Sequence, residues 1–243
     1  VLSFENAAPD IRIVTLGLPA NEPMQFQAGQ HVDVLLPDGV RRSYSIANRP
    51  KAEGVRQLEL HIKHMPGGRF TDHVFQTLKP REIWQIEMPL GSFCLKEAST
   101  KPIILVATGT GFAPLKSMML VALEQDAQRP IHLYWGGRHL VDLYQLEIAQ
   151  EWAQLHPRIK LVPVLSQPTS EDDWSGRKGY VQHAVLQDHP NLRNFEVYAC
   201  GVPSMVDAAR HDFEKLGGLP AEAFFADAFL SEADRQLHNA TPV

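Results

Sequence analysis

Cysteine is nearly absent from this sequence, whose 243 residues include only Cys94 and Cys200. Two thiols cannot supply the four thiolates of an iron–sulfur cluster or of a cysteine-rich zinc site within the chain. The eleven histidines show no spacing that is typical of metal ligands. We therefore expect no metal bound within this chain.

The sequence also lacks a long apolar run and an excess of positive charge. The best apolar run, Ile103–Ala107, is far shorter than the roughly 20 residues that span a bilayer. No signal-peptide pattern opens the chain. We expect no membrane span and a cytoplasmic location. The 23 basic and 28 acidic residues give a net charge of −5, so nucleic-acid binding is not expected.

Short segments that alternate apolar and polar residues dominate before residue 100. The pattern is typical of an antiparallel sandwich or a small barrel. One helix is expected among them, because Phe70, Val74 and Leu78 share a helical face, and Thr71 or Asp72 would cap its start. The predicted strands are Ile11–Leu16, His31–Leu36, Arg42–Ala47, Gln57–Ile62 and Ile83–Met88.

Strand and helix patterns alternate after residue 100, which predicts a doubly wound parallel sheet. The polar stretch Lys96–Lys101 separates the two textures. We expect domains at 1–98 and 99–230 and a polar tail at 231–243. The predicted strands are Pro102–Ala107, Ile131–Trp135, Ile159–Leu165, Phe195–Cys200 and Phe224–Ala226, and the predicted helices are Ala113–Leu123, Leu143–Leu155, Val181–Gln187 and Met205–Leu216.

Two glycine-rich loops are candidate phosphate sites. Gly109-Thr110-Gly111 follows a predicted strand and precedes a helix, where backbone N–H groups and the helix dipole attract anions. Gly67-Gly68 precedes the predicted first helix. A tight turn that needs glycine explains either loop as well.

Two strand ends carry reactive or charged side chains. Cys200-Gly201 ends a later strand of the parallel sheet, where ligands bind, although a free cysteine is more often a small buried hydrophobe. Arg42-Ser43-Tyr44-Ser45 ends an earlier strand. Alternation puts Arg42 and Tyr44 on one face and the two serines on the other, unless the strand ends or bulges there. A solvated strand end is the alternative.

In this order and spacing, the motifs resemble those of the ferredoxin–NADP reductase superfamily. That family's pattern is Arg-x-Tyr-Ser/Thr, Gly-Gly-x-x-Ser/Thr, Gly-Thr-Gly-x-Ala-Pro and Cys-Gly-x-Pro. This sequence supplies all four, and Phe224–Phe229 resembles the family's acidic-aromatic ending. The resemblance is strongest to the bacterial NAD(P)H-flavin reductase and CDP-6-deoxyglucoseen reductase-like group.

The resemblance implies a six-stranded antiparallel FAD-binding barrel followed by a nicotinamide-binding α/β domain. Arg42 would then pair with the flavin pyrophosphate, Tyr44 would pack on the isoalloxazine ring and Ser45 would hydrogen-bond near N5. The remaining FAD-binding residues implied are Ser43, Ile62, Lys63, Gly67, Gly68, Phe70 and Thr71.

The same resemblance assigns residues to NAD(P)H, the hydride donor. Gly109, Thr110 and Gly111 would bind its pyrophosphate, and Cys200 and Gly201 would lie beside the nicotinamide. Asp227 and Phe229 would close the site, so that Ser45, Cys200 and Asp227 form the catalytic set. Arg138 would reach the ribose or a 2′-phosphate unless it is simply exposed, which leaves NADH or NADPH open with a lean to NADH or dual use.

Three functions are compatible with this assignment. The first is an FAD-dependent NAD(P)H oxidoreductase that passes single electrons to an iron–sulfur protein or domain. Because the chain begins with Val1, it would be part of a longer [2Fe–2S] protein or the partner of a ferredoxin. The second is a reductase that releases free flavin, against which the Gly67–Thr71 loop argues. The third is a non-catalytic redox sensor.

Overall fold

The computed structural model describes residues 1–124 and 129–229, and these form two compact units. The first unit comprises residues 1–100, 112–124 and 144–151. The second comprises residues 101–111, 129–143 and 152–229. The chain therefore passes from one unit to the other more than once, and each unit is built from separate stretches of sequence.

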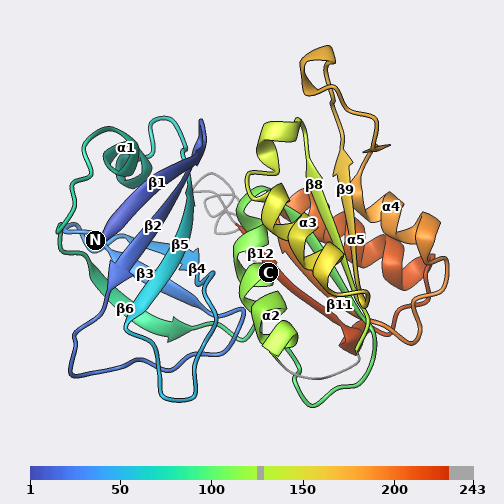
Figure 1. Cartoon of the computed structure of the whole chain (residues 1–243), viewed down its shortest axis with the longest axis horizontal. Coiled ribbons are helices and arrows are strands. Elements are labelled where there is room, and N and C mark those ends of the chain that lie inside the picture. Colours follow the sequence, from blue (N-terminus) through green and yellow to red (C-terminus); the bar gives the residue numbers. More distant parts are fainter. Residues whose placement is uncertain (125–128, 230–243) are drawn as a thin grey trace, which may run out of the picture. The chain divides into compact units, whose positions relative to one another are not determined.

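Within the described residues, the first unit has six antiparallel strands in two sheets, ordered β1-β2-β5 and β4-β3-β6 (Figure 1). A bridge between Ile46 and Leu60 joins the two sheets. The predicted antiparallel barrel is confirmed, but β1 was not predicted because its sequence SFENAA does not alternate. The strands are β1 (Ser3–Ala8), β2 (Ile11–Gly17), β3 (His31–Leu35), β4 (Arg41–Ser45), β5 (Gln57–Lys63) and β6 (Gln85–Leu90).

Helix α1 (Arg69–Gln76) begins earlier than its sequence pattern suggested. Gly68 is its N-cap, so the prediction that Thr71 or Asp72 caps it is wrong. The Thr71 hydroxyl instead donates to the carbonyl of Met65 at 2.9 Å. Phe70 and Val74 are buried in the barrel core together with strand residues such as Leu60.

Helix α2 (Phe112–Glu124) belongs to the first unit, as do the first residues of α3 (Leu146–Leu155). Ten of the thirteen residues of α2 are buried, which explains why its sequence is apolar on nearly every side. The lysine at position 116 is among the buried ones, and a buried charge needs a partner.

The second unit contains, among its described residues, a six-stranded parallel sheet in the order β10-β9-β8-β7-β11-β12. The predicted doubly wound sheet is confirmed. The Ile103–Ala107 run is buried throughout, as expected for a strand that is covered on both faces. The strands are β7 (Ile103–Thr108), β8 (Ile131–Gly137), β9 (Ile159–Leu165), β10 (Arg177–Lys178), β11 (Glu196–Gly201) and β12 (Phe224–Ala228).

Helices α4 (Val181–Asp188) and α5 (Pro203–Lys215) pack against each other and against this sheet. They share one core with the sheet, which includes Tyr134, Val197 and Phe213. Four short 3₁₀ turns complete the described elements: η1 (Gly109–Gly111), η2 (Leu140–Asp142), η3 (Ser170–Asp172) and η4 (Ala221–Ala223).

No helix in residues 1–124 and 129–229 is long and apolar enough to cross a bilayer. The expected polar tail at 231–243 lies outside the described residues.

Candidate functional site

The Arg42–Ser45 motif lies on β4, which pairs with β3 in antiparallel register. Arg42 is opposite Val34 and Tyr44 is opposite Val32. The Tyr44 ring lies 5.6 Å from the ring of Phe70, so the fold brings β4 and α1 together. Burial raises the pKa of Tyr44, and its phenol therefore stays neutral. A flat aromatic face and an arginine on one strand suit a flavin ring and its pyrophosphate.

The two serines of the motif have different environments although they lie on one face of the strand. Ser43 Oγ donates to Asp33 Oδ1 at 2.6 Å. Ser45 is 5% exposed, and its hydroxyl has no hydrogen-bond partner within the described part of the chain. A buried unsatisfied hydroxyl costs about 1–3 kcal/mol. The Ser45 hydroxyl rotates freely about its Cβ–Oγ bond. It can therefore form a hydrogen bond with the polar edge of a ring that binds beside Tyr44.

The Gly67-Gly68 loop is shaped by two different demands. A Cβ on Gly68 would lie 2.7 Å from both the Met65 carbonyl oxygen and Thr71 Oγ1, so packing requires glycine there. Gly67 has φ +81°, and no heavy atom of the described residues lies within 4 Å of its ideal Cβ position. Its amide donates to Asp72 Oδ2 at 3.1 Å. The open side of Gly67 therefore suits an incoming phosphate, while its N–H is already engaged.

The two FAD-site residues assigned to β5 lie in contrasting places. Ile62 is fully buried in the barrel core. Lys63 is half-buried at the strand end, and its Nζ lies 3.2 Å from Asp10 Oδ2. Of the two, Lys63 is the one whose side chain meets solvent.

The nucleotide motifs meet at the carboxyl edge of the parallel sheet. Neighbouring strands place Cys200 in register with Ala107 on one side and Asp227 on the other. The amide of Phe229 donates to the carbonyl of Gly201 at 2.9 Å. This edge brings together Gly109, Thr110, Gly111, Cys200, Gly201, Asp227 and Phe229.

Close backbone approach explains two of the glycines at this edge. A Cβ on Gly111 would overlap the carbonyl oxygen of Cys200, and one on Gly201 would overlap Thr108 Oγ1. Gly201 also has φ +149°. Gly109 differs, since no heavy atom of residues 1–124 and 129–229 lies within 4 Å of its ideal Cβ position. Backbone N–H groups on an open glycine turn at a strand end are suited to phosphate.

The Cys200 thiol is fully buried. Burial raises its pKa well above the usual range, and the negative charge of Asp227 adds to the effect. The thiol is therefore neutral, which excludes a thiolate nucleophile in this conformation.

Two carboxylates that sequence reasoning missed surround the turn after β8. Asp142 Oδ2 accepts the amides of Arg138 at 2.7 Å and His139 at 3.1 Å, and lies 3.7 Å from Arg138 Nε. Asp172 accepts the amide of Leu140 at 2.7 Å and lies 3.4 Å from the His139 ring. Backbone hydrogen bonds lower the pKa of Asp172 to about 2. Asp172 forms a capping box with Thr169, which lies three residues earlier, and this spacing is the sequence signal that could have identified it.

Sequence reasoning also missed a buried cluster on β5. His61 Nε2 lies 2.7 Å from Glu59 Oε1, and His61 Nδ1 lies 2.6 Å from the Tyr144 hydroxyl. Lys116 Nζ donates to the same Glu59 oxygen at 2.7 Å. No local sequence pattern links these residues, because they come from three distant segments.

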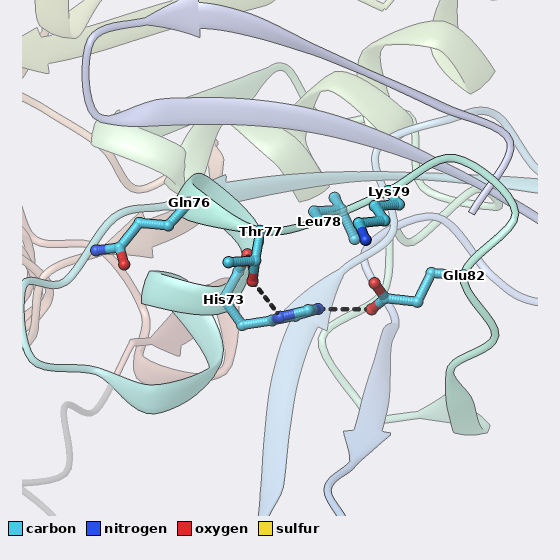
Figure 2. A pocket seen from close by; sticks show the side chains of 6 residues that line it. All are labelled: His73, Gln76, Thr77, Leu78, Lys79 and Glu82. Carbon is cyan, nitrogen blue, oxygen red and sulfur yellow. Dashed lines mark hydrogen bonds and ion pairs between the residues drawn. The ribbon is translucent and has the colours of Figure 1, made fainter.

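A separate pocket lies at the end of α1 (Figure 2). His73 bridges it, with Nε2 2.6 Å from Glu82 Oε1 and Nδ1 2.7 Å from Thr77 Oγ1. The residues predicted above to bind FAD or NAD(P)H do not line it. Its lining residues are His73, Gln76, Thr77, Leu78, Lys79 and Glu82.

Comparison with protein families matches both halves of the chain. Residues 1–94 match the oxidoreductase FAD-binding domain, and residues 105–211 match the oxidoreductase NAD-binding domain.

Individual relatives cover nearly all of this chain. A CDP-6-deoxy-L-threo-D-glycero-4-hexulose-3-dehydrase reductase of Yersinia pseudotuberculosis is 43% identical over 228 residues, which are 94% of this chain and 67% of that protein. A terephthalate 1,2-dioxygenase reductase component 1 of Comamonas sp is 38% identical over 232 residues, with the same coverage. The crystal structure of the Amycolatopsis cytochrome P450 reductase GcoB is similar with a TM-score of 0.85 and 36% identity, over 94% of this chain and 68% of that one. The chain thus spans about two thirds of the length of these relatives.

Proposed function

The chain belongs to the ferredoxin–NADP reductase superfamily, and from this premise we propose that it takes a hydride from NAD(P)H onto bound FAD and passes single electrons to an iron–sulfur protein or domain. Family membership confirms the resemblance that the four motifs predicted. The FAD-binding match precedes the NAD-binding match along the chain, in the order expected from the sequence. The chain is accordingly an NAD(P)H-dependent flavoprotein reductase.

The Ser45 hydroxyl, which follows Tyr44 and has no hydrogen-bond partner among residues 1–124 and 129–229, is the observation that carries the FAD assignment. When bound, FAD supplies a ring that accepts a hydride and releases electrons one at a time. In the proposal Tyr44 packs on that ring and Ser45 donates a hydrogen bond to its edge. Arg42 neutralises the pyrophosphate together with the open side of Gly67.

The carboxyl edge of the parallel sheet holds the hydride donor in this proposal. The open turn at Gly109–Gly111 presents backbone N–H groups to the pyrophosphate. The close approach of Gly111 to Cys200 keeps this turn beside the end of β11. A neutral, buried Cys200 thiol forms no covalent bond with substrate, so the protein contributes by positioning the nicotinamide against the flavin.

The acidic surroundings of Arg138 support NADH as the donor. Arg138 lies 3.7 Å from Asp142 Oδ2, so part of its positive charge is already balanced, and the His139 ring faces Asp172. A 2′-phosphate placed at this turn would meet two carboxylates. A ribose 2′-hydroxyl, in contrast, can donate to a carboxylate.

The relatives support a separate electron acceptor, because several of them are reductase components of larger oxygenase or demethylase systems. These include a reductase component of terephthalate 1,2-dioxygenase and a reductase subunit of an aromatic O-demethylase. A reductase component needs a partner that receives electrons.

Release of reduced flavin is the second candidate function, and retention of FAD by the purified protein would argue against it. A purely passive sensor is the third candidate, and it would not oxidise NADH steadily with ferricyanide.

The test begins with the absorbance spectrum of the purified protein after gel filtration with added FAD. We expect a retained flavin spectrum that NADH bleaches under anaerobic conditions. A subsequent screen compares a [2Fe–2S] ferredoxin with free flavin as acceptor. A protein that retains no FAD and bleaches none with either NADH or NADPH would refute the proposal.

A further inference from the structure

Four polar side chains form a continuous hydrogen-bonded chain on one face of β5, and we call them the Glu59 cluster: Glu59, His61, Lys116 and Tyr144. The imidazole of His61 joins the Glu59 carboxylate to the Tyr144 hydroxyl, and Lys116 approaches the same carboxylate from α2. Strand alternation places this face opposite the barrel core. The core-facing residues of β5 are Leu58, Leu60 and Ile62.

Two members of the Glu59 cluster are shielded from solvent, and the Glu59 side chain is 26% exposed. The His61 side chain is fully buried and that of Lys116 is 10% exposed. A carboxylate only accepts hydrogen bonds, so His61 Nε2 carries the proton and Nδ1 accepts from the Tyr144 hydroxyl. Burial raises the pKa of Glu59, but the hydrogen bonds from His61 and Lys116 and the charge of Lys116 outweigh burial and lower the pKa below its usual range.

The protonation states of Glu59 and His61 are therefore fixed near neutral pH. Burial lowers the pKa of His61, although Glu59 opposes the change. His61 is thus neutral while Glu59 and Lys116 carry opposite charges. Both ring nitrogens of His61 are engaged, by Glu59 and by Tyr144, so the cluster is suited to hold a geometry and not to deliver a proton.

The cluster ties together segments that adjoin the nucleotide loops. Lys116 is on α2, which begins immediately after the Gly109–Gly111 turn. Tyr144 follows directly on the turn that contains Arg138 and Asp142. Both of these segments leave the second unit and join the first at these points. The cluster thus fastens to one barrel strand the two segments that continue from the predicted NAD(P)H-binding loops.

Further bonds connect α2 to the chain just beyond the flavin motif. Ser117 Oγ donates to the carbonyl of Asn48 at 2.8 Å. Asn48 Oδ1 accepts the amide of Glu59 at 2.8 Å. Arg49 pairs with Glu124 at the other end of α2. Segment 46–49, which follows Ser45, is therefore held by the same helix as the cluster.

Buried ion pairs contribute little net stability compared with apolar packing, but some hold one particular arrangement of the elements that they join. On the basis of the proposed function, we propose that the Glu59 cluster positions the NAD(P)H-binding loops for hydride transfer to the flavin at Tyr44 and Ser45. His61, Lys116 and Tyr144 are positioning residues that act through the backbone of these loops.

Tyr144→Phe and Lys116→Met test this role, because each removes one polar contact and keeps most of the side-chain volume. The matched control is Tyr134→Phe in the second unit. This substitution also removes the hydrogen bond of a buried tyrosine, which Tyr134 donates to Asp188 Oδ2 at 2.8 Å. Anaerobic stopped-flow at saturating NADH measures flavin reduction. Long-wavelength charge-transfer absorbance of the reduced flavin with NAD⁺ reports stacking of the two rings, and fluorescence titration measures FAD affinity.

We expect flavin reduction to slow by about 10- to 100-fold in both cluster variants, because small misplacement of reacting atoms has effects of that size. Charge-transfer absorbance falls, while the FAD dissociation constant stays within about threefold of the wild-type value. Hydrogen exchange of the apoprotein provides a readout independent of activity. Amides of 112–124 and 146–151 exchange faster in both variants, whereas those of β1 and β2 are unchanged. Tyr134→Phe leaves all of these readouts at wild-type values.

Two outcomes overturn the inference. In the first, both cluster variants reduce FAD at the wild-type rate. In the second, the loss of rate follows the loss of FAD affinity or of global stability, and Tyr134→Phe causes an equal loss. Failure of the proposed function is distinguishable, because wild-type protein would then show no flavin reduction by NADH or NADPH.

Discussion

Replacing Ser45 with alanine is expected to stabilise the apoprotein, although Ser45 is assigned to the FAD site. The Ser45 hydroxyl is buried and lacks a hydrogen-bond partner among the described residues. Removing it relieves a desolvation cost of about 1–3 kcal/mol. For a chain of this size, that corresponds to a rise in melting temperature of about 2–12 °C.

Linkage makes the complementary prediction for FAD binding. If FAD satisfies the Ser45 hydroxyl, the variant loses in free energy of FAD binding what the apoprotein gains in stability. We expect the FAD dissociation constant of Ser45→Ala to increase about 5- to 150-fold, the equivalent of about 1–3 kcal/mol. Urea unfolding of FAD-free protein and fluorescence titration with FAD measure the two quantities separately.

Ser43→Ala is the matched stability control from the same strand. Its hydroxyl donates to Asp33, so its loss should destabilise the apoprotein by about 1 kcal/mol. The two serine variants thus have opposite signs. Lower stability of apo Ser45→Ala, or an unchanged FAD dissociation constant, would refute the assignment of Ser45 to the flavin.

Four other outcomes are expected. At saturating FAD, Ser45→Ala should reduce flavin about tenfold more slowly in stopped-flow, equivalent to 1.4 kcal/mol of lost transition-state stabilisation; an unchanged rate contradicts a catalytic role. Gly111→Ala should lower the free energy of unfolding, measured by urea titration, by about 3 kcal/mol, since its Cβ would overlap the Cys200 carbonyl. Asp172→Asn should improve kcat/KM for NADPH relative to NADH, and a constant ratio argues against NADH selection by charge. Burial lowers the pKa of His132 from 6.5 to about 4, so unfolded chains bind protons that the folded protein does not. The free energy of unfolding therefore falls as pH drops from 6.5 towards 4, and less steeply in His132→Phe, as pH-dependent urea titrations would show.

Periodic patterns predicted most of the described elements because they depend on neighbouring residues. The continuous run Ile103–Ala107 predicted a strand buried on both faces, and β7 confirms it. Alternation predicted β2 and β5 with nearly their observed bounds. The two-residue strand β10 was too short to produce a pattern. Its hydrogen bonds to β9 depend on tertiary packing.

The order of the four motifs was sufficient to identify the superfamily, since glycines at turns and a charged strand end are local requirements of nucleotide sites. The partners of individual polar groups were beyond such reasoning. Alternation places Ser43 and Ser45 on one face, yet Asp33 satisfies only Ser43. The difference depends on which side chain of a neighbouring strand lies within reach.

The sequence alone therefore determined the two-part architecture, the FAD and NAD(P)H classes of ligand and the candidate residues at strand ends and loops. Only the tertiary structure revealed that Gly111 must lack a side chain because of the Cys200 carbonyl. Only the tertiary structure joined His61 to Tyr144, which are 83 positions apart. Local conformation follows from nearby residues, whereas hydrogen-bond partners and close contacts are decided when distant segments pack and exclude water.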